Sequence, residues 1–545
     1  MRAALITIGT ATALWSSAQA PPTIAHRQMD ELMSSCFEGS NAPGACMLVA
    51  KGGHVIYRRS TGSADRSMPL ATDAVFRIGN ITEQFTAVAI LQLVNEGKLI
   101  LSDEVQTYLD FPRKDWPITI EQLLTHTSGI PNYTDLPAFT PSSYAKDVTL
   151  PEVIATFKDL PLEFEPGTRW SYNNSGYVLL SAVLERLSGM SWEMCMNERF
   201  FGPLGMGRSG AGPVNARLPG EPLGFQKGDS GWEPAVPMSM TWPVGAGAIR
   251  STVDDLFTWN TAVMTDQLLP THLRTAAHTD HVIKSGEPKG YGYGWNLMKV
   301  QGSPSIEHNG GINGFTSASL YLPREDIYAV VLCNAETDVA SRLAPQLAAI
   351  AMGKPYPSGP GIHMPIDGLK ELEGVYLDVD SVKRYITADE QGLHAQREGS
   401  TKRDLIPTAP DTFYYKGDVT AVVFKREEGR VIAADIVSRS NDEHLVLTEL
   451  PLPNWSGVKL AAEALKKYAG TFELSPGFSI TFRVEDDRLF GRATGQPECE
   501  LFAEGPDTFF LKVVDARIEF YPEKDGSVKR LTLFQGGAAP GRRIR

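Results

Sequence analysis

The sequence predicts an α/β domain, in which an antiparallel sheet is flanked by helices, followed by two small antiparallel β-barrels in tandem. Three observations predict this fold. In the first 355 residues, strand-like runs stand near both ends and segments with helical periodicity lie between them. Two Pro- and Gly-containing breaks interrupt the chain further on. Each break leads into short runs of alternating apolar and polar residues, which are typical of a β-meander.

Two helices are predicted inside the first domain. The first begins near Asn80 and carries Phe85 and Val88 at helical spacing. The second covers residues 175–189 and ends at Gly189, because a glycine readily adopts the left-handed conformation that stops a helix.

The predicted strands of the first domain lie at its two ends, in residues 45–62 and 317–334. Both stretches are rich in Val, Ile, Leu and Tyr and contain a short turn. Because strands stand at both ends with helices between them, we expect the terminal strands to share one sheet.

The rest of the chain contains an internal repeat. Gly374 and Gly470 are 96 positions apart, and so are Asp411 and Asp507. The same spacing relates LEGVYL to YAGTFE and PDTFYYK to PDTFFLK. A repeated meander of this length predicts two tandem barrels, which close so that no sheet edge stays unpaired. Neither copy contains a nucleophile with a plausible base, so both are predicted to be accessory.

The N-terminus has the layout of a secretory signal peptide. Arg2 precedes an apolar run over residues 3–15, and Ala18 and Ala20 have the small-residue spacing of a cleavage site, although Pro21 follows the expected cut. The run is too short to span a bilayer, and no other stretch approaches 18 apolar residues. The mature protein is therefore expected in the periplasm or outside the cell, without a membrane span.

These signals divide the chain into six parts. They are a signal peptide at 1–20, the α/β domain at 21–355, a linker at 356–368, a first barrel at 369–450, a linker at 451–466 and a second barrel at 467–545.

Composition excludes some partners and cofactors. The net charge of -13 repels phosphate backbones, so nucleic acid is not expected as a partner. The histidines and cysteines show no metal-ligand spacing, and no phosphate-cradling glycine loop follows a strand, so no cofactor is expected. Of the five cysteines, Cys36 and Cys46 could pair in an oxidising compartment, or all five could be buried thiols, which is the favoured alternative.

Three short stretches could carry chemistry. GNITE stands at the start of the first helix, WSYNNSG precedes the second, and EHNGG opens a strand. They belong to a longer series of motifs that occur in order: FRIGNITEQFTAVAILQL, ITIEQLLTHTSGIPNY, EPGTRWSYNNSGYVLL, FFGPLGM, GAGAIRSTVDDLFTW, YGYGW and HNGGINGFTSA.

This series resembles the serine β-lactamase and penicillin-binding protein superfamily, in its branch of class C β-lactamases, D-aminopeptidases and esterases. The resemblance covers residues 28 to 350. It implies a β-lactamase-like fold with a cleft for peptide, amide or ester-like ligands. A hydrolytic domain followed by two lipocalin-like barrels also resembles the D-aminopeptidase arrangement.

Two of the family's three motifs carry over. Tyr-x-Asn corresponds to Tyr172 and Asn174, which implies that Tyr172 relays protons and Asn174 binds the substrate. By contrast, His126 in the THTSG motif is predicted to be a structural hydrogen-bonder.

The third motif of the family, Lys-Thr-Gly or His-x-Gly, lines the opposite wall of the cleft. It corresponds here to His308, Asn309 and Gly310, with Gly311 beside them. The resemblance implies that His308 takes part in catalysis and that the three residues after it bind the substrate.

The first motif, Ser-x-x-Lys, is altered at both chemical positions, where Asn80 and Glu83 stand. An amide nitrogen has a delocalised lone pair and cannot form an acyl-enzyme, and a carboxylate inverts the charge of the lysine. Thr82 lies about 200° round the helix from Asn80 and points away. Two other Ser-x-x-Lys matches, Ser143 to Lys146 and Ser456 to Lys459, are attributed to chance.

Four hypotheses remain open. The favoured one is a pseudoenzyme that binds its ligand without acylation. The second is a catalyst of different chemistry, in which burial raises the pKa of Glu83 so that it acts as general base with Tyr172 and Asn80. The third is an ordinary hydrolase of amide or ester bonds with an unidentified nucleophile. The fourth is that the barrels bind the partner and the first domain is a scaffold.

Overall fold

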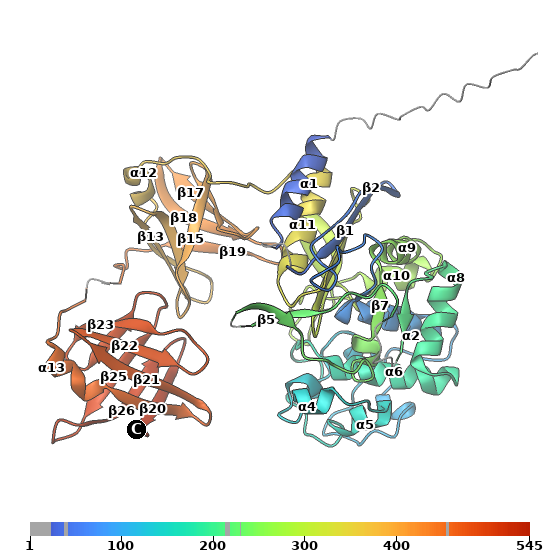
Figure 1. Cartoon of the computed structure of the whole chain (residues 1–545), viewed down its shortest axis with the longest axis horizontal. Helices are drawn as coiled ribbons and strands as arrows, with labels where there is room; N and C mark the ends of the chain where they lie inside the picture. The colour runs from blue at the N-terminus through green and yellow to red at the C-terminus, as the bar shows by residue number, and fades with distance from the viewer. Residues whose placement is uncertain (1–22, 38–41, 213–217, 229, 454–456) are drawn as a thin grey trace, which may run out of the picture. The chain divides into compact units, whose positions relative to one another are not determined.

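The protein consists of two compact units, Met1–Pro355 and Tyr356–Arg545 (Figure 1). The computed structural model describes residues 23–37, 42–212, 218–228, 230–453 and 457–545. The predicted signal peptide lies outside these residues. Within the described residues, no helix is long and apolar enough to cross a membrane.

A six-stranded antiparallel sheet forms the centre of the first unit, in the order β2-β1-β11-β10-β9-β8. The first and last strands lie side by side, with Ala45 opposite Cys333, so the prediction that the terminal strands share a sheet is confirmed. The strands are β1 (Ala45–Lys51), β2 (His54–Thr61), β8 (Asn296–Val300), β9 (Ser303–Ile312), β10 (Phe315–Leu322) and β11 (Ile327–Cys333).

Helices cover both faces of this sheet. On one face, α11 packs on β10 and β11, and α1 packs on α11 (Figure 1). On the other face, α9 packs on β1 and β11, and the remaining helices lie beyond it. The helices are α1 (Ile24–Ser34), α2 (Thr82–Asn95), α3 (Ile120–Leu124), α4 (Pro141–Tyr144), α5 (Leu150–Ala155), α6 (Asn174–Ser188), α7 (Trp192–Met196), α8 (Gly202–Leu204), α9 (Val253–Val263), α10 (Thr271–Ala277) and α11 (Val339–Met352).

Short elements connect these layers. They are the 3-10 turns η1 (Gly79–Ile81), η2 (Val105–Thr107), η3 (Tyr133–Asp135) and η5 (Val244–Ala246), the π-turn η4 (Asn197–Phe201), a small sheet of β3 (Phe76–Arg77), β7 (Ile249–Ser251) and β4 (Gly210–Ala211), and a hairpin of β5 (Phe225–Gly228) and β6 (Gly231–Pro234).

The two predicted helices are α2 and α6. All of α2 from Thr82 to Leu91 is buried, which is why its apolar residues are not confined to one face. The side chain of Asn173 accepts a hydrogen bond from Gly176 N and caps the start of α6. The helix ends at Gly189 with φ 73°, as predicted.

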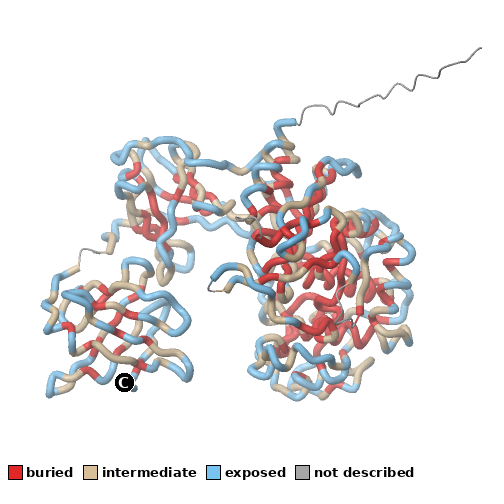
Figure 2. Tube along the Cα trace, viewed as in Figure 1, coloured by how far each residue is buried: buried red, intermediate tan, exposed pale blue. Residues whose placement is uncertain are grey.

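The second unit contains two closed antiparallel barrels of eight strands each, and buried residues fill each interior (Figure 2). The first comprises β12 (Gly374–Leu377), β13 (Lys383–Asp389), β14 (Gly392–Arg397), β15 (Arg403–Ala409), β16 (Thr412–Tyr415), β17 (Ala421–Glu427), β18 (Arg430–Val437) and β19 (Asp442–Leu447). The second comprises β20 (Gly470–Ser475), β21 (Phe478–Glu485), β22 (Arg488–Ala493), β23 (Cys499–Gly505), β24 (Thr508–Leu511), β25 (Arg517–Pro522), β26 (Val528–Phe534) and β27 (Ala538–Arg543). Short helical segments α12 (Ile366–Lys370), α13 (Ala462–Leu465) and η6 (Lys466–Tyr468) precede the strands.

The repeat in the sequence is a repeat of the barrel core. Phe413 and Phe424 fill the first barrel, and Phe509 and Phe520 occupy the matching places in the second. A hydrogen bond from the backbone N–H of Phe424 to Asp411 O is matched by one from Phe520 to Asp507 O, both 2.8 Å long. The two-barrel prediction is therefore confirmed.

All five cysteines are free thiols in the structure. Cys46 is fully buried in β1, and Cys36 is buried after the end of α1. Burial raises the pKa of Cys36 to about 11 and that of Cys46 to about 12, which keeps both thiols protonated and unreactive. The structure therefore contains no disulfide between Cys36 and Cys46.

Candidate functional site

Three segments that are distant in the sequence meet in one cleft of the first unit. They are the start of α2 with its preceding turn η1, the residues just before α6, and the end of β9. Two glycines permit this close approach. A Cβ on Gly79, where φ is +51°, would lie 2.8 Å from the backbone nitrogen of Gly311, and a Cβ on Gly310 would lie 2.1 Å from Ile78 O.

Hydrogen bonds to the small sheet also hold the start of α2 in place. The backbone N–H of Ile78 donates to Ile249 O, and Thr82 Oγ1 accepts from Ile249 N at 3.2 Å. Thr82 is fully buried in this contact. Its hydroxyl therefore faces the small sheet, which agrees with the expectation that it points away from Asn80.

Asn80 bridges the two walls of the cleft. Its Nδ2 donates to Asn174 Oδ1 at 2.8 Å, and its Oδ1 accepts from the backbone N–H of Gly311 at 3.3 Å. One end of the carboxamide is therefore bound to the start of α6 and the other end to β9.

Asn174 is held on its other side as well. Its backbone N–H donates to Asn132 Oδ1 at 3.1 Å, and its Nδ2 donates to Thr134 Oγ1 at 3.3 Å. The amide predicted to bind a substrate thus has protein partners for both its oxygen and its nitrogen.

Glu83 lies one helical turn after Asn80 and is completely buried. Tyr172 OH donates to Oε1 at 2.7 Å, and Tyr291 OH donates to Oε2 at 3.1 Å. The Nε2 atoms of His126 and His308 lie 3.3 and 3.6 Å from Oε2. Oxygen and nitrogen donors therefore surround the carboxylate where the family's lysine is expected.

The Nδ1 atoms of the two histidines have opposite hydrogen-bonding roles. Asn173 N donates to His126 Nδ1, so the imidazole proton of His126 sits on Nε2 and faces Glu83 and Tyr291. His308 Nδ1 donates to Asn309 O at 2.6 Å. Its Nε2 lies 3.1 Å from Tyr291 OH and 3.6 Å from Glu83 Oε2.

This arrangement overturns the expectation of a raised pKa for Glu83. Burial alone raises the pKa, but electrostatic attraction and hydrogen bonding from the imidazole N–H groups of His126 and His308 outweigh burial and lower it from 4.5 to about 2. Glu83 is therefore ionised at neutral pH and is a weak base.

The neighbouring phenols remain protonated. Burial, followed by the negative charge of Glu83, raises the pKa of Tyr172 well above 10. For Tyr291, burial and the neighbouring Tyr177 and Glu83 have the same effect. Both hydroxyls act as hydrogen-bond donors to the carboxylate rather than as proton acceptors.

Sequence reasoning gave no place in this cluster to two of its members. Tyr291 lies in the YGYGW motif, which indicates the family resemblance but by itself predicts no role for this tyrosine. His126 was predicted to be a structural hydrogen-bonder; the structure gives it that contact to Asn173 and also places it on Glu83. The feature of the sequence that could have placed His126 in the cluster is its position in the THTSG motif.

The remaining predicted site residues lie on β9. His308 is buried beside Tyr291, and Gly311 binds Asn80 through its backbone. Successive side chains of a strand leave from opposite faces, so the exposed side chain of Asn309 points away from His308, and its carbonyl alone reaches that histidine.

The match from Ser143 to Lys146 is not assembled with this cluster. Ser143 caps α4, where its Oγ donates to Ala138 O and accepts from Thr140 N. Ser456 lies outside the described residues. Among the described residues there is also no group of three or more His, Cys, Asp or Glu side chains that could hold a metal ion.

Comparison with known proteins identifies two regions of the chain. The family model described as "Beta-lactamase" matches residues 29–352. A second model, described as a domain of unknown function (DUF3471), matches residues 456–541, which cover the second barrel except for the end of β27.

Known relatives and solved structures agree with the match to the β-lactamase model. Penicillin-binding protein 4* of Bacillus subtilis is 26% identical over 442 residues, which cover 74% of this chain and 94% of the relative. A D-aminopeptidase of Gluconobacter oxydans is 28% identical over 343 residues, or 62% of this chain and 63% of the relative. The structure of a D-stereospecific amidohydrolase from Streptomyces aligns with a TM-score of 0.51 and 26% identity, covering 58% of this chain and 95% of that one.

The lowered pKa of Glu83 predicts how the stability of the first unit depends on pH. A carboxyl group with a lowered pKa stabilises the fold above its ordinary value of 4.5, and this contribution is lost as pH falls toward about 2. We expect Glu83→Gln to remove that contribution, which amounts to at most about 3 kcal/mol. Denaturant unfolding from pH 7 to pH 2 measures it, with tryptophan fluorescence as the probe. Seven of the nine tryptophans, Trp116 to Trp295, lie in the described part of the first unit and dominate this signal, and Trp455 of the second unit is the same in all variants.

The matched control is Glu198→Gln, which changes an exposed glutamate of the same unit. Its stability should follow that of the wild type at every pH. The difference in unfolding free energy between the wild type and Glu83→Gln should shrink between pH 4.5 and pH 2. A constant difference across this range would contradict the lowered pKa.

Proposed function

The chain belongs to the β-lactamase family, and we propose that its first unit binds peptide, amide or ester-like ligands in the family's cleft without forming an acyl-enzyme. One observation carries this proposal. In the turn η1, just before α2, where the family has its nucleophilic serine, the carboxamide of Asn80 is bonded to both walls of the cleft. A carboxamide held in this way offers no lone pair for attack on a carbonyl.

The cluster around Glu83 supports the same conclusion. A lysine at this place would take the serine proton. Glu83 is ionised, fully buried and hydrogen-bonded by Tyr172 and Tyr291, so it has neither the basicity nor the access to activate a water molecule. A catalyst that uses Glu83 as its general base therefore has less support than a pseudoenzyme.

An active hydrolase of amide or ester bonds is the second candidate. The observation in its favour is that relatives at 28% and 26% identity are called a D-aminopeptidase and a D-stereospecific amidohydrolase. It requires a nucleophile other than Asn80. The two candidates differ in whether a covalent intermediate forms.

The Asn80 contacts also support an amide as the ligand group. The Gly311 N–H binds a carbonyl oxygen and Asn174 Oδ1 binds an amide nitrogen, so the two walls complement a carboxamide. A ligand amide that displaced the side chain of Asn80 would find both partners in place.

We also propose that the protein is exported to the periplasm or the medium, with residues 1–20 as its signal peptide. The support is the pattern of Arg2, the apolar run and the small residues before Ala20. Expression with the native N-terminus should give an extracytoplasmic protein whose intact mass lacks the leader. Recovery of the full-length mass from the cytoplasm alone would refute export.

Covalent labelling tests the absence of acylation. We expect the wild type to remain unlabelled by a fluorescent penicillin and by a fluorophosphonate, because Asn80 cannot attack either reagent. The double variant Asn80→Ser/Glu83→Lys restores Ser-x-x-Lys in the same helix and should become labelled at Ser in position 80. Gel fluorescence and peptide mass spectrometry measure the adduct.

The single variants serve as controls. Asn80→Ser alone keeps the weakly basic carboxylate of Glu83 and should label much more slowly than the double variant, and Glu83→Lys alone should not label. A stoichiometric adduct on any serine of the wild-type cleft would establish the hydrolase candidate instead.

Asn80→Ala tests the ligand class. Removing the carboxamide frees the Gly311 N–H and Asn174 Oδ1, and two hydrogen bonds of about 1 kcal/mol each predict a gain of roughly tenfold or more in affinity for an amide. The probes are 2-phenylpropionamide and 2-phenylpropionate, each as both enantiomers, measured by calorimetry. The amide should gain more than the acid, which cannot donate to Asn174.

Asn197→Ala is the matched control, because it makes the same change at an exposed position after α7. Its affinities should equal those of the wild type. Equal gains for the acid and the amide in Asn80→Ala would argue against a carboxamide-binding cleft.

A further inference from the structure

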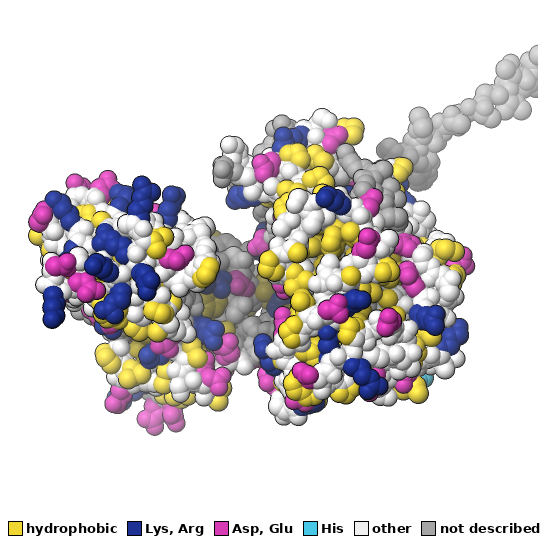
Figure 3. Space-filling model, turned by 90° about the horizontal axis from the view of Figure 1, so that it is seen from below, with side chains coloured by type: hydrophobic (Ala, Val, Ile, Leu, Met, Phe, Trp, Pro, Cys, Tyr) yellow, Lys and Arg dark blue, Asp and Glu magenta, His cyan; other side chains and the backbone are white. Residues whose placement is uncertain are grey.

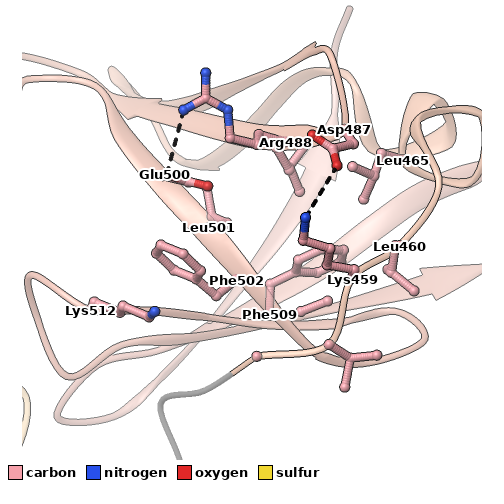
Figure 4. Close-up of a pocket in the computed structure, with 14 residues that line it drawn as sticks. Lys459, Leu460, Leu465, Asp487, Arg488, Glu500, Leu501, Phe502, Phe509 and Lys512 are labelled. Atoms are coloured by element: carbon pink, nitrogen blue, oxygen red, sulfur yellow. Dashed lines mark ion pairs between the residues drawn. The ribbon is translucent and has the colours of Figure 1, made fainter.

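A pocket opens in the second barrel, between residues 457–460 and the strands β22 and β23 (Figure 4). Its cavity volume is about 240 Å³. This is below the roughly 300–1,000 Å³ of pockets for drug-sized ligands, and it leaves space for about eight groups the size of a water molecule. The pocket therefore fits a small molecule.

The pocket exists because the incoming chain is attached to the barrel at two points. Val458 N donates to Ala503 O at 2.6 Å, and Gly457 makes the turn before it with φ +67°. Further along, Leu465 of α13 is buried in the barrel core. Between these two attachments the chain stands away from the strands and leaves the cavity.

The floor of the pocket is apolar and partly aromatic. Leu489, Leu501 and Phe509 belong to the buried core of the barrel. The ring of Phe502 is only partly buried and stacks on Phe510 at a centroid distance of 5.8 Å. An apolar group of a ligand would displace water from this floor.

The rim of the pocket carries three cations. Lys512 Nζ lies 3.9 Å from the centroid of the Phe502 ring. Lys459 and Arg488 face Asp487 and Glu500 respectively, and each ion pair is 4.0 Å long and solvent-exposed (Figure 4). Exposed pairs at such distances contribute little to stability, so the cations can exchange these partners for another anion.

The first barrel provides an internal comparison, because it repeats the same frame 96 residues earlier. Ile362 N donates to Pro407 O at 2.8 Å, as Val458 N does to Ala503 O. The rim differs at the positions of two cations and of the exposed ring, where His363, Gly392 and Ile406 replace Lys459, Arg488 and Phe502.

The overall charge of the two barrels differs in the same direction as their rims: the second barrel is less acidic than the first. The second barrel, residues 467–545, has 12 basic and 12 acidic residues, whereas residues 369–450 have 11 and 16. Lys and Arg side chains gather on the face of the second barrel seen in Figure 3. In a chain of net charge -13, this barrel is the part best suited to an anion.

We propose that this pocket binds a small amphipathic carboxylate, whose ring or branched apolar group rests on Phe502 and the leucines while its carboxylate lies among Lys459, Arg488 and Lys512. The site is formed by other residues than the cleft of the first unit. It assigns a binding role to the part of the chain that matches a domain of unknown function.

Calorimetric titration of the full-length protein with 3-phenylpropionate and with 3-phenylpropionamide tests this site. The two probes share the apolar part and differ in charge. We expect the acid to bind about fivefold more tightly than the amide at low salt, with a preference that declines as salt screens the rim. Equal binding of the two probes, or binding of neither, would overturn the proposal.

Two variants locate the binding. Lys459→Gln/Arg488→Gln should abolish the preference for the acid and leave the amide unchanged. Phe502→Ile, which introduces the residue of the first barrel, should weaken both probes severalfold. Binding of the acid that survives in the first variant would lie elsewhere and would refute this site.

The matched control is Lys529→Gln/Arg530→Gln, which removes the same two charges from exposed positions on β26. It should retain the preference for the acid. An equal loss in this control would show that the net charge of the barrel, and not the pocket, attracts the acid. Unfolding temperatures of all three variants establish that the barrel is intact.

Discussion

A buried carboxylate surrounded by hydrogen-bond donors organises the cleft of the first unit. Glu83 is fully buried at the start of α2, and a charge removed from water is tolerated only where polar partners replace the solvent. Tyr172, Tyr291 and His126 supply those partners from three separate segments. Each segment must keep its position for the carboxylate to remain satisfied, so one side chain fixes the geometry of the whole site.

Asn80 acts on the same cleft in a second way. A serine would leave the Gly311 N–H and Asn174 Oδ1 available to a ligand, whereas the carboxamide of Asn80 binds both. The two replacements are therefore consistent with each other. One removes the nucleophile and occupies its surroundings, and the other replaces a base that would have served that nucleophile. The pocket of the second barrel is made by other residues than this cleft: its frame is the barrel repeat, and three cations lie on its rim.

Much of the fold could be predicted because its signals are local or repeated. Helical spacing located α2 and α6, and the matching of Gly374 with Gly470 predicted the two barrels. The site was harder to predict. Tyr291 reaches Glu83 from 208 residues away, and nothing in its own neighbourhood distinguishes it from a core tyrosine. For that reason the sequence predicted a raised pKa for Glu83 from burial, while the structure shows donors that lower it.

The sequence by itself determined the chemical groups at positions 80 and 83, the order of the motifs and the presence of a duplicated barrel. Each of these depends only on which residues occur and on the spacing between them. Only the tertiary structure decided the ionisation of Glu83, the partners of Asn80 and the open pocket beside Phe502. Hydrogen bonds and desolvation act over a few ångströms. Which groups come within that distance is settled only when remote segments pack together.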